Sequence, residues 1–288
     1  MLVSYDQSRS IATNVHQHTV SFAKLIALGN DTLILNYVRV YENPTKPAPL
    51  SVLDCLGALS VAINLKPDLI LVHTNNISVN PLALCDSLLN LSGIIWPPVQ
   101  LNPVELHRNM SGKRITYIAH EADVRKLQAV EEYGGLVLDF DVYVTNGTLL
   151  RSLLKQYPCI VCHEVDRLNA GFLGCRKPHA RYPQLILDEV YRKNYNPECW
   201  LCSSGTKPFN ILKRNNGTAA MVDGVCDHDS GVVKVKNWET LPAFHSYWHQ
   251  NPFTLKDTQK LNSTLGDIFR WLLKGAPRAL AGHHMPLE

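Results

Sequence analysis

The sequence predicts an α/β domain with a largely parallel sheet flanked by helices. Strand-like and helix-like segments alternate from residue 33 to about residue 145, as in consecutive βα units. The run Leu69-Ile70-Leu71-Val72 is apolar on both faces, as in the buried strands of a parallel sheet. With 288 residues, of which 45% are hydrophobic and 18% charged, the chain is long enough to bury a sizeable core.

The elements of the first half can be placed from composition and periodicity. Segments rich in β-branched and aromatic residues are expected to be strands, and they are residues 32–41, 66–76 and 113–120. Segments with apolar residues at helical spacing are expected to be helices, and they are residues 50–65, with Ser51 as a candidate N-cap, 81–92 and 121–133. Gly134-Gly135 ends the last helix and leads into an apolar strand that carries Asp139 and Asp141.

The second half is less regular. A strand is expected at residues 158–165, and helices are expected at residues 183–195, 207–215 and 266–277. The sequence shows no internal repeat and no clean domain boundary; if a boundary exists, residues 146–158 are the place for it. We therefore expect a single domain over residues 1–288.

The two aspartates in "LVLDFDVYV" are the first candidate site. Residues i and i+2 of a strand face the same way, so Asp139 and Asp141 should share a face while Phe140 turns away. Two carboxylates this close repel each other unless a cation or a shared proton compensates them. The simpler alternative is two solvated acids at the end of a strand.

The preceding helix should bring further polar residues to the same place. At roughly 18 Å, helix 121–133 has about the length of the returning strand, so the helix start and the strand end share one edge of the sheet. His120, Asp123 and either Arg125 or Lys126 then come within reach of Asp139 and Asp141. Open α/β sheets bind ligands at this edge, and paired carboxylates suit a hard divalent cation, so we expect a metal-bound nucleotide diphosphate here.

The stretch "AHEADVRKLQAVEEYGGLVLDFDVYV" resembles the core of DXD-containing glycosyltransferases of the GT32 type. That pattern runs roughly H-x-S-D-x-x-R, then Y-G-G-x-Y-x-D-x-D. The resemblance implies a GT-A-like, Rossmann-type fold and a retaining hexosyltransferase that depends on a divalent cation, Mn²⁺ or Mg²⁺. It further implies transfer from a nucleotide-sugar donor, with a UDP-sugar favoured, to a hydroxyl of a glycan or glycolipid acceptor.

The resemblance also assigns roles to residues. It divides the chain into a nucleotide-sugar-binding half (33–145), an acceptor-side half (146–275) and a tail (276–288). The expected metal ligands are Asp139 and Asp141. The expected donor-binding residues are His120, Asp123, Arg125, Lys126, Asp139, Asp141 and Asn169, and two further residues, His245 and Trp248, are placed to close the site from the C-terminal half. No catalytic base is assigned, because a retaining transferase need not use an enzymic nucleophile.

Departures from the pattern leave two alternatives open. Ala122 stands in place of the Ser, Lys126 in place of the Arg and Val137 in place of the Tyr, and the first strand has no Trp. Lys keeps the charge of Arg but loses its bidentate geometry. A catalytically degenerate binding protein of the same fold is therefore one alternative. An aspartate-nucleophile phosphatase-like hydrolase is the other, because "DFDVY" is superficially similar to the signature of those enzymes.

The cellular compartment is suggested by glycosylation sequons. The pattern N-x-S/T occurs at seven asparagines, where roughly two would be expected by chance; they are Asn30, Asn76, Asn90, Asn109, Asn146, Asn216 and Asn262. This excess predicts a protein of the secretory pathway, in the Golgi lumen. No apolar run is long enough to span a membrane and "MLVSYDQSRS" is no signal peptide, so we expect membrane attachment only through an anchor missing from this chain.

The cysteines leave two structural alternatives open. The pairs in "CIVC" and "CWLC" have the spacing of zinc knuckles, whereas a secreted protein favours disulfides or buried thiols for its eight cysteines. The net charge of +3, with Lys and Arg scattered along the chain, does not suggest a nucleic-acid partner.

Overall fold

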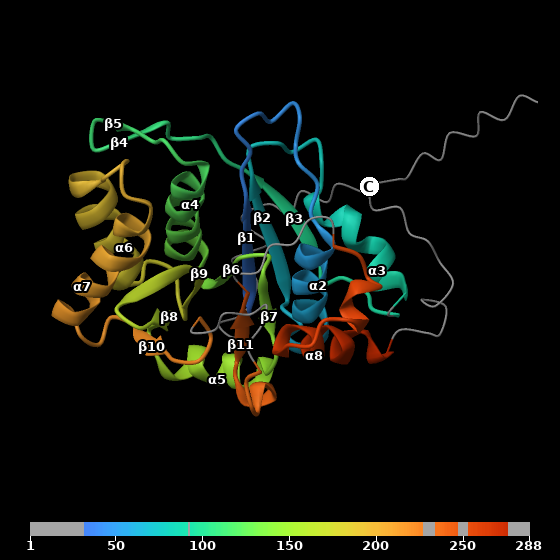
Figure 1. Ribbon diagram of the computed structural model, residues 1–288. Coiled ribbons are helices and arrows are strands. Elements are labelled where there is room, and N and C mark those ends of the chain that lie inside the picture. Colours follow the sequence, from blue (N-terminus) through green and yellow to red (C-terminus); the bar gives the residue numbers. More distant parts are fainter. Residues whose placement is uncertain (1–31, 92, 227–233, 247–252, 276–288) are drawn as a thin grey trace, which may run out of the picture. The chain divides into compact units, whose positions relative to one another are not determined.

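The computed structural model describes residues 32–91, 93–226, 234–246 and 253–275. Its centre is a seven-stranded sheet with the strand order β10-β8-β9-β6-β1-β2-β3 (Figure 1). The strands are β1 (Ile34–Arg39), β2 (Leu69–Thr74), β3 (Val99–Pro103), β6 (Gly135–Leu138), β8 (Cys159–Glu164), β9 (Arg167–Cys175) and β10 (Ala220–Val222). Strand β9 is antiparallel to both of its neighbours, and the other neighbouring strands are parallel. The predicted α/β fold class, with a largely parallel sheet flanked by helices, is confirmed.

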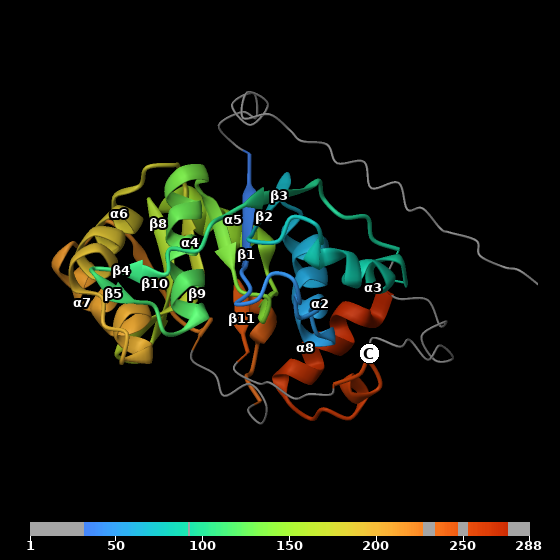
Figure 2. The same cartoon turned by 90° about the horizontal axis from the view of Figure 1, so that it is seen from above.

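Helices cover both faces of this sheet. They are α2 (Val52–Ser60), α3 (Asp86–Leu91), α4 (Ile118–Tyr133), α5 (Gly147–Gln156), α6 (Arg181–Ile186), α7 (Lys207–Arg214) and α8 (Thr264–Leu272). Helices α4, α6 and α7 lie on one side of β1, and α2, α3 and α8 lie on the other, in both views (Figures 1 and 2). Alternate residues of β6 separate two cores, because Leu136 and Leu138 pack with the α2 side and Val137 packs with the α4 side.

The helix predicted at residues 50–65 is confirmed together with its cap. The Ser51 side chain accepts a hydrogen bond from the Asp54 backbone N–H, and the Asp54 side chain accepts one from the Ser51 N–H, which makes a capping box. A π-helical turn, Val61–Leu65, continues α2 to the predicted end. The short helix predicted at residues 81–92 is also present, as a 3₁₀ turn (Pro81–Cys85) followed by α3.

The strand predicted at residues 113–120 is wrong. Residues Lys113–Arg114 form β5 of a two-stranded hairpin with β4 (Asn109–Met110), and α4 already begins at Ile118. The third parallel strand of the first half is instead β3, which pairs with β2. Its sequence, Val-Gln-Leu-Asn-Pro, has two amides and a proline, so its composition resembles a loop, and only pairing with β2 makes it a strand.

All eight cysteines form disulfides, which excludes the zinc alternative. The bonds are Cys55–Cys85, Cys159–Cys175, Cys162–Cys226 and Cys199–Cys202. Neither zinc-like pair provides free thiolates, because the "CIVC" cysteines bond to two different partners and the "CWLC" cysteines bond to each other.

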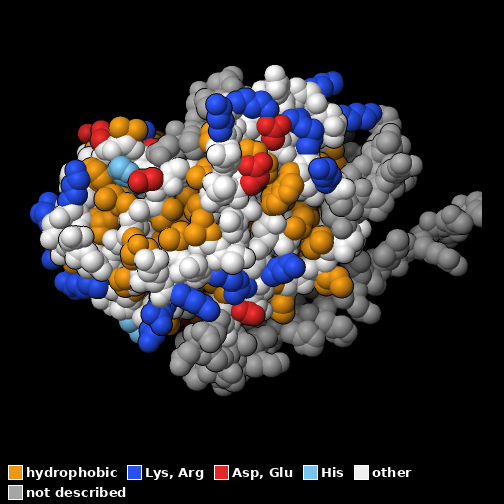
Figure 3. Space-filling model, turned by 90° about the horizontal axis from the view of Figure 1, so that it is seen from below, with side chains coloured by type: hydrophobic (Ala, Val, Ile, Leu, Met, Phe, Trp, Pro, Cys, Tyr) orange, Lys and Arg blue, Asp and Glu red, His pale blue; other side chains and the backbone are white. Residues whose placement is uncertain are grey.

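The described helices are too short and too polar for any of them to cross a membrane. On the face that Figure 3 shows, Lys and Arg side chains lie in several separate groups, with hydrophobic side chains between them. The described residues of this face therefore form no continuous basic track.

Candidate functional site

Asp139 and Asp141 lie on a tight turn directly after β6, not on the strand itself. The Val142 N–H donates to the Asp139 carbonyl at 3.1 Å, which closes the turn. The Asp139 N–H donates to the Gly171 carbonyl at 2.8 Å, which ties the turn to β9. Phe140 points away as predicted, and its ring stacks on Tyr37 of β1 with 4.3 Å between centroids. The turn thus holds both carboxylates at the carboxyl end of the strand.

Helix α2 fixes the segment that follows the turn. The Tyr143 hydroxyl donates to the Leu53 carbonyl at 3.3 Å, and the Val144 N–H donates to the Ser60 hydroxyl at 2.9 Å. Tyr143 and Val144 belong to β7 (Val142–Val144), which is fully buried. A rigid segment on each side of the aspartates limits how far their backbone can move.

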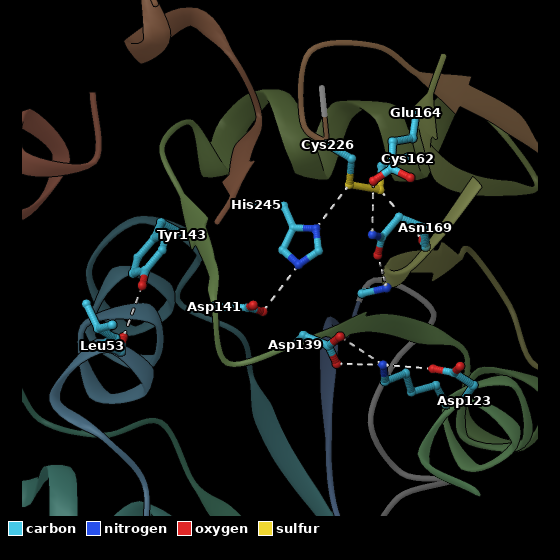
Figure 4. Close-up of polar contacts among 12 residues, drawn as sticks. Leu53, Asp123, Asp139, Asp141, Tyr143, Cys162, Glu164, Asn169, Cys226 and His245 are labelled. Atoms are coloured by element: carbon cyan, nitrogen blue, oxygen red, sulfur yellow. Dashed lines mark hydrogen bonds and ion pairs between the residues drawn. A yellow bond between two sulfur atoms is a disulfide. The ribbon is translucent and has the colours of Figure 1, made fainter. Parts of the chain in front are cut away.

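His245 joins the two aspartates from the C-terminal half of the chain. It ends β11 (Ala243–His245), which pairs antiparallel with β7, and the next N–H, of Ser246, donates to the Asp141 carbonyl at 2.9 Å. The His245 Nε2 atom lies 3.3 Å from Asp141 Oδ1 (Figure 4). Ligand atoms of Asp139, Asp141 and His245 all lie within 4.8 Å of one another.

The imidazole of His245 lies between a disulfide and the Asp141 carboxylate. Its Nδ1 atom lies 3.5 Å from the Cys226 sulfur, which can only accept a hydrogen bond because it is bonded to Cys162. The other ring nitrogen, Nε2, faces the Asp141 carboxylate, and a proton or a metal ion between these two groups would stabilise the pair.

Lys126 balances the charge of the acids from α4. Its ammonium lies 2.7 Å from Asp139 Oδ1 and 3.1 Å from Asp123 Oδ1. The Lys126 and Asp123 side chains are 7% and 10% exposed, whereas that of Asp139 is 33% exposed. Asp139 is thus the open member of this ion-pair chain, and the other two are fixed behind it.

The surroundings shift the pKa values of the acids and the imidazole. Burial raises the pKa of Asp139, the ammonium of Lys126 opposes that rise and the nearby Asp141 adds to it. Burial alone would lower the pKa of His245, but the carboxylates of Asp141 and Asp139 raise it above its usual value. In the absence of a metal, the cluster therefore tends to retain a proton, which a bound cation would replace.

Asn169 and Gly171 of β9 lie against the remaining side of the Asp139–Asp141–His245 cluster. The Asn169 Oδ1 atom accepts from the Gly171 N–H at 2.7 Å, so its side chain is held beside the cluster (Figure 4). A Cβ atom at Gly171 would lie 2.9 Å from Asp139 Oδ2 and from Asn169 Oδ1, and 3.1 Å from His245 Cε1. Only glycine lets these three side chains lie this close to the β9 backbone.

The structure brings together five of the seven residues predicted to bind the donor. They are Asp123, Lys126, Asp139, Asp141 and Asn169.

His120 and Arg125 do not join them. His120 is buried, with Nδ1 2.7 Å from the Tyr195 hydroxyl and Nε2 2.9 Å from the Trp200 carbonyl. Arg125 contacts Glu121 on the opposite side of α4, where it lines a separate cavity of about 620 Å³. Trp248 lies outside the described residues.

Sequence reasoning missed Gly171 entirely and gave His245 no role as a metal ligand. Gly171 has no local signal, because the need for glycine there is set largely by Asp139 and His245, which lie on two other segments. His245 was expected only to close the site from the C-terminal half, because the pairing of β11 with β7 could not be inferred from either segment alone.

Comparisons with known proteins give limited similarity. No protein-family model matches the chain. The chain is 32% identical over 90 residues to Glucan organizing enzyme 1 of Cryptococcus neoformans var. grubii, a match that covers 31% of this chain and 22% of that protein. The chain thus matches only about a fifth of the length of this curated relative.

Among solved structures, an active-site mutant of LgtC is similar with a TM-score of 0.46 and 11% identity, over 87% of this chain and 99% of that one. The glycosyltransferase GlyE of Streptococcus pneumoniae is similar with a TM-score of 0.41 and 15% identity, over 85% and 64%. Both TM-scores lie below 0.5, so the function of this chain has to be inferred from its own site.

Proposed function

We propose that this protein is a metal-dependent, retaining glycosyltransferase that uses a nucleotide-sugar donor, with a UDP-sugar favoured, and a hydroxyl of a glycan or glycolipid acceptor. One observation carries the proposal. Two carboxylates and an imidazole converge just after the carboxyl end of β6, at the edge of the sheet where α/β folds bind nucleotides.

The residues fit a divalent cation. Carboxylate and imidazole ligands suit Mn²⁺, and carboxylates suit Mg²⁺. The Nε2 atom of His245 faces Asp141 at 3.3 Å, and the missing side chain of Gly171 lets Asp139 and His245 approach the β9 backbone. Asp139, Asp141 and His245 would hold the ion, which would neutralise charge on the diphosphate.

The reaction breaks the bond between the anomeric carbon of the sugar and a diphosphate oxygen. It forms a bond from that carbon to the acceptor oxygen, and the acceptor proton passes to the departing diphosphate. Lys126 would direct positive charge towards the donor, and Asp123 would accept hydrogen bonds from hydroxyls of the donor sugar. In this proposal the donor lies on residues 33–145, whereas residues 146–275 supply the acceptor side and His245.

The sequons and the four disulfides support a place in the secretory pathway, and we propose the Golgi lumen as its site of action.

The test is substitution of one ligand. We expect Asp141→Ala to abolish Mn²⁺-dependent binding of UDP in calorimetric titrations while the thermal unfolding midpoint changes little. The matched control is Asp166→Ala, since Asp166 is an exposed acid on the turn between β8 and β9. Unchanged Mn²⁺-dependent binding of both UDP and GDP by the Asp141 variant would contradict the proposal.

A second candidate function is binding without catalysis. It is favoured by the aromatic residues on and just after the first strand, β1, which are buried or covered. Tyr37 is fully buried and covered by Phe140, and Tyr41 is only 8% exposed, with the guanidinium of Arg39 over its ring. The described part of β1 therefore offers no open aromatic ring on which a base could stack. Turnover of a panel of UDP- and GDP-sugars, with Mn²⁺ or with a chelator, separates the two candidates, because only the enzyme consumes the donor.

A further inference from the structure

Two aromatic side chains are exposed together at the start of α4. Trp200 is 52% exposed and Tyr117, the N-cap residue of α4, is 37% exposed. Their rings meet edge to face with 5.0 Å between centroids. Single exposed apolar residues are common, but two large aromatic rings that pack on each other and remain open to solvent form a small apolar platform.

The buried His120 ring and a disulfide hold this platform in place. His120 donates from Nε2 to the Trp200 carbonyl, and its ring centroid lies 5.1 Å from that of Tyr117 and 5.8 Å from that of Trp200. The Cys199–Cys202 disulfide closes the backbone on either side of Trp200. A ligand that binds here would therefore not need to order the platform first, which lowers the entropic cost of binding.

The platform lies next to the proposed donor site. His120 precedes Asp123 by three residues, so the two lie one turn apart on the same side of α4. Ser203 and Ser204, which follow the disulfide loop, line the same small cavity as Asp123 and Lys126. The aromatic rings and the acid expected to hold the donor sugar are thus joined by one turn of helix and one short loop.

We propose that Trp200 and Tyr117 form the subsite that binds the acceptor saccharide. This inference depends on the proposed function and extends it, because it says where the acceptor lies. The apolar C–H face of a pyranose ring matches the area of one or two aromatic rings. Exposed polar groups border the platform and can meet the sugar hydroxyls, among them Thr116 and Glu198. A stable protein partner would need a patch of about 800 Å² or more on each side, far larger than two rings.

The experiment measures saccharide binding separately from donor binding. The full glycosylated chain is titrated with a defined panel of oligosaccharides, laminarihexaose, cellohexaose, mannohexaose and lactose, by calorimetry and by tryptophan fluorescence. The variants are Trp200→Ala and Trp200→Phe, and the matched control is Trp271→Ala, another half-exposed tryptophan, on α8. UDP binding with Mn²⁺ is measured on each variant.

We expect at least one oligosaccharide to bind, with a loss of tenfold or more in affinity in Trp200→Ala, partial retention in Trp200→Phe and no change in Trp271→Ala. UDP binding should be equal in all four proteins. The subsite is refuted if no member of the panel binds, or if Trp200→Ala binds as tightly as the native chain. It is also refuted if the native chain binds lipid vesicles, Trp200→Ala does not, and neither binds any of the oligosaccharides. Trp200-dependent saccharide binding without any UDP binding would instead refute the proposed function and leave the subsite standing.

Discussion

Replacement of Lys126 by Met should increase the affinity of the protein for Mn²⁺. In the native chain the ammonium lies 2.7 Å from Asp139 and 3.1 Å from Asp123, so it competes with a metal ion for the Asp139 carboxylate. Met has a similar length and no charge. The substitution therefore removes the competing cation, while the side chain still fills its buried position on α4.

The expected gain in Mn²⁺ affinity can be estimated from the distances at the site. A cation bound to Asp139 at about 2.1 Å would lie roughly 4 to 5 Å from the Lys126 nitrogen. Two unit charges 4 Å apart interact by about 1 kcal/mol even in bulk water, so at this buried lysine a divalent ion and the ammonium repel each other by at least about 2 kcal/mol. Removal of the ammonium should therefore tighten binding by at least roughly 30-fold.

The assay is Mn²⁺ titration of the native chain and of Lys126→Met, with Lys126→Arg as the control that keeps the charge. We expect the Arg variant to bind Mn²⁺ about as the native chain does. The Met variant should unfold at a lower temperature without metal, since Asp123 loses its buried partner, and Mn²⁺ should restore part of that loss. Weaker or equal Mn²⁺ binding by a folded Met variant would show that Lys126 does not compete for the site.

Three further predictions follow from other parts of the structure. Gly171→Ala places a Cβ 2.9 Å from Asp139, so it should weaken Mn²⁺ binding at least tenfold in calorimetric titrations, at a cost of about 1 to 3 kcal/mol in stability. Burial and the charge of Arg125 lower the pKa of His73 to about 4, so its contribution to stability is present above pH 6.5 and is lost as the pH falls. Between pH 7.5 and pH 5, denaturant unfolding should show the native chain losing about 2 kcal/mol more than His73→Gln, and equal losses would contradict this. Enzymatic deglycosylation followed by mass spectrometry should find glycans at the sequon asparagines that are exposed, among them Asn90, Asn109, Asn216 and Asn262.

Local sequence signals were sufficient where one segment decides the outcome. The capping box at Ser51 and Asp54 acts within one helical turn, so the start of α2 could be predicted from these residues alone. Gly134 adopts a φ of 66° at the end of α4, a conformation that a side chain disfavours, and the sequence shows this ending directly. Asp123, Lys126, Asp139 and Asp141 lie on one helix–strand unit, whose lengths already bring them together.

Predictions failed where a distant partner decides the outcome. Strand β3 exists because β2 offers it a hydrogen-bonding edge, and the residues after β5 become helical although their composition favours a strand. Arg125 and Lys126 are adjacent in sequence, yet the packing of α4 on the sheet directs Lys126 to Asp139 and Arg125 to the opposite side.

The sequence by itself therefore determined the α/β alternation, the acidic pair and the helix that faces it, because these depend on propensity and spacing within about 30 residues. Only the tertiary structure decided that His245 completes the cluster, that the Cys162–Cys226 disulfide lies against its ring and that Trp200 reaches the start of α4. The physical reason is that each of these contacts depends on strand pairing, a disulfide or helix packing between segments far apart in the chain. The sequence of one segment does not show where the other segment of such a contact will lie.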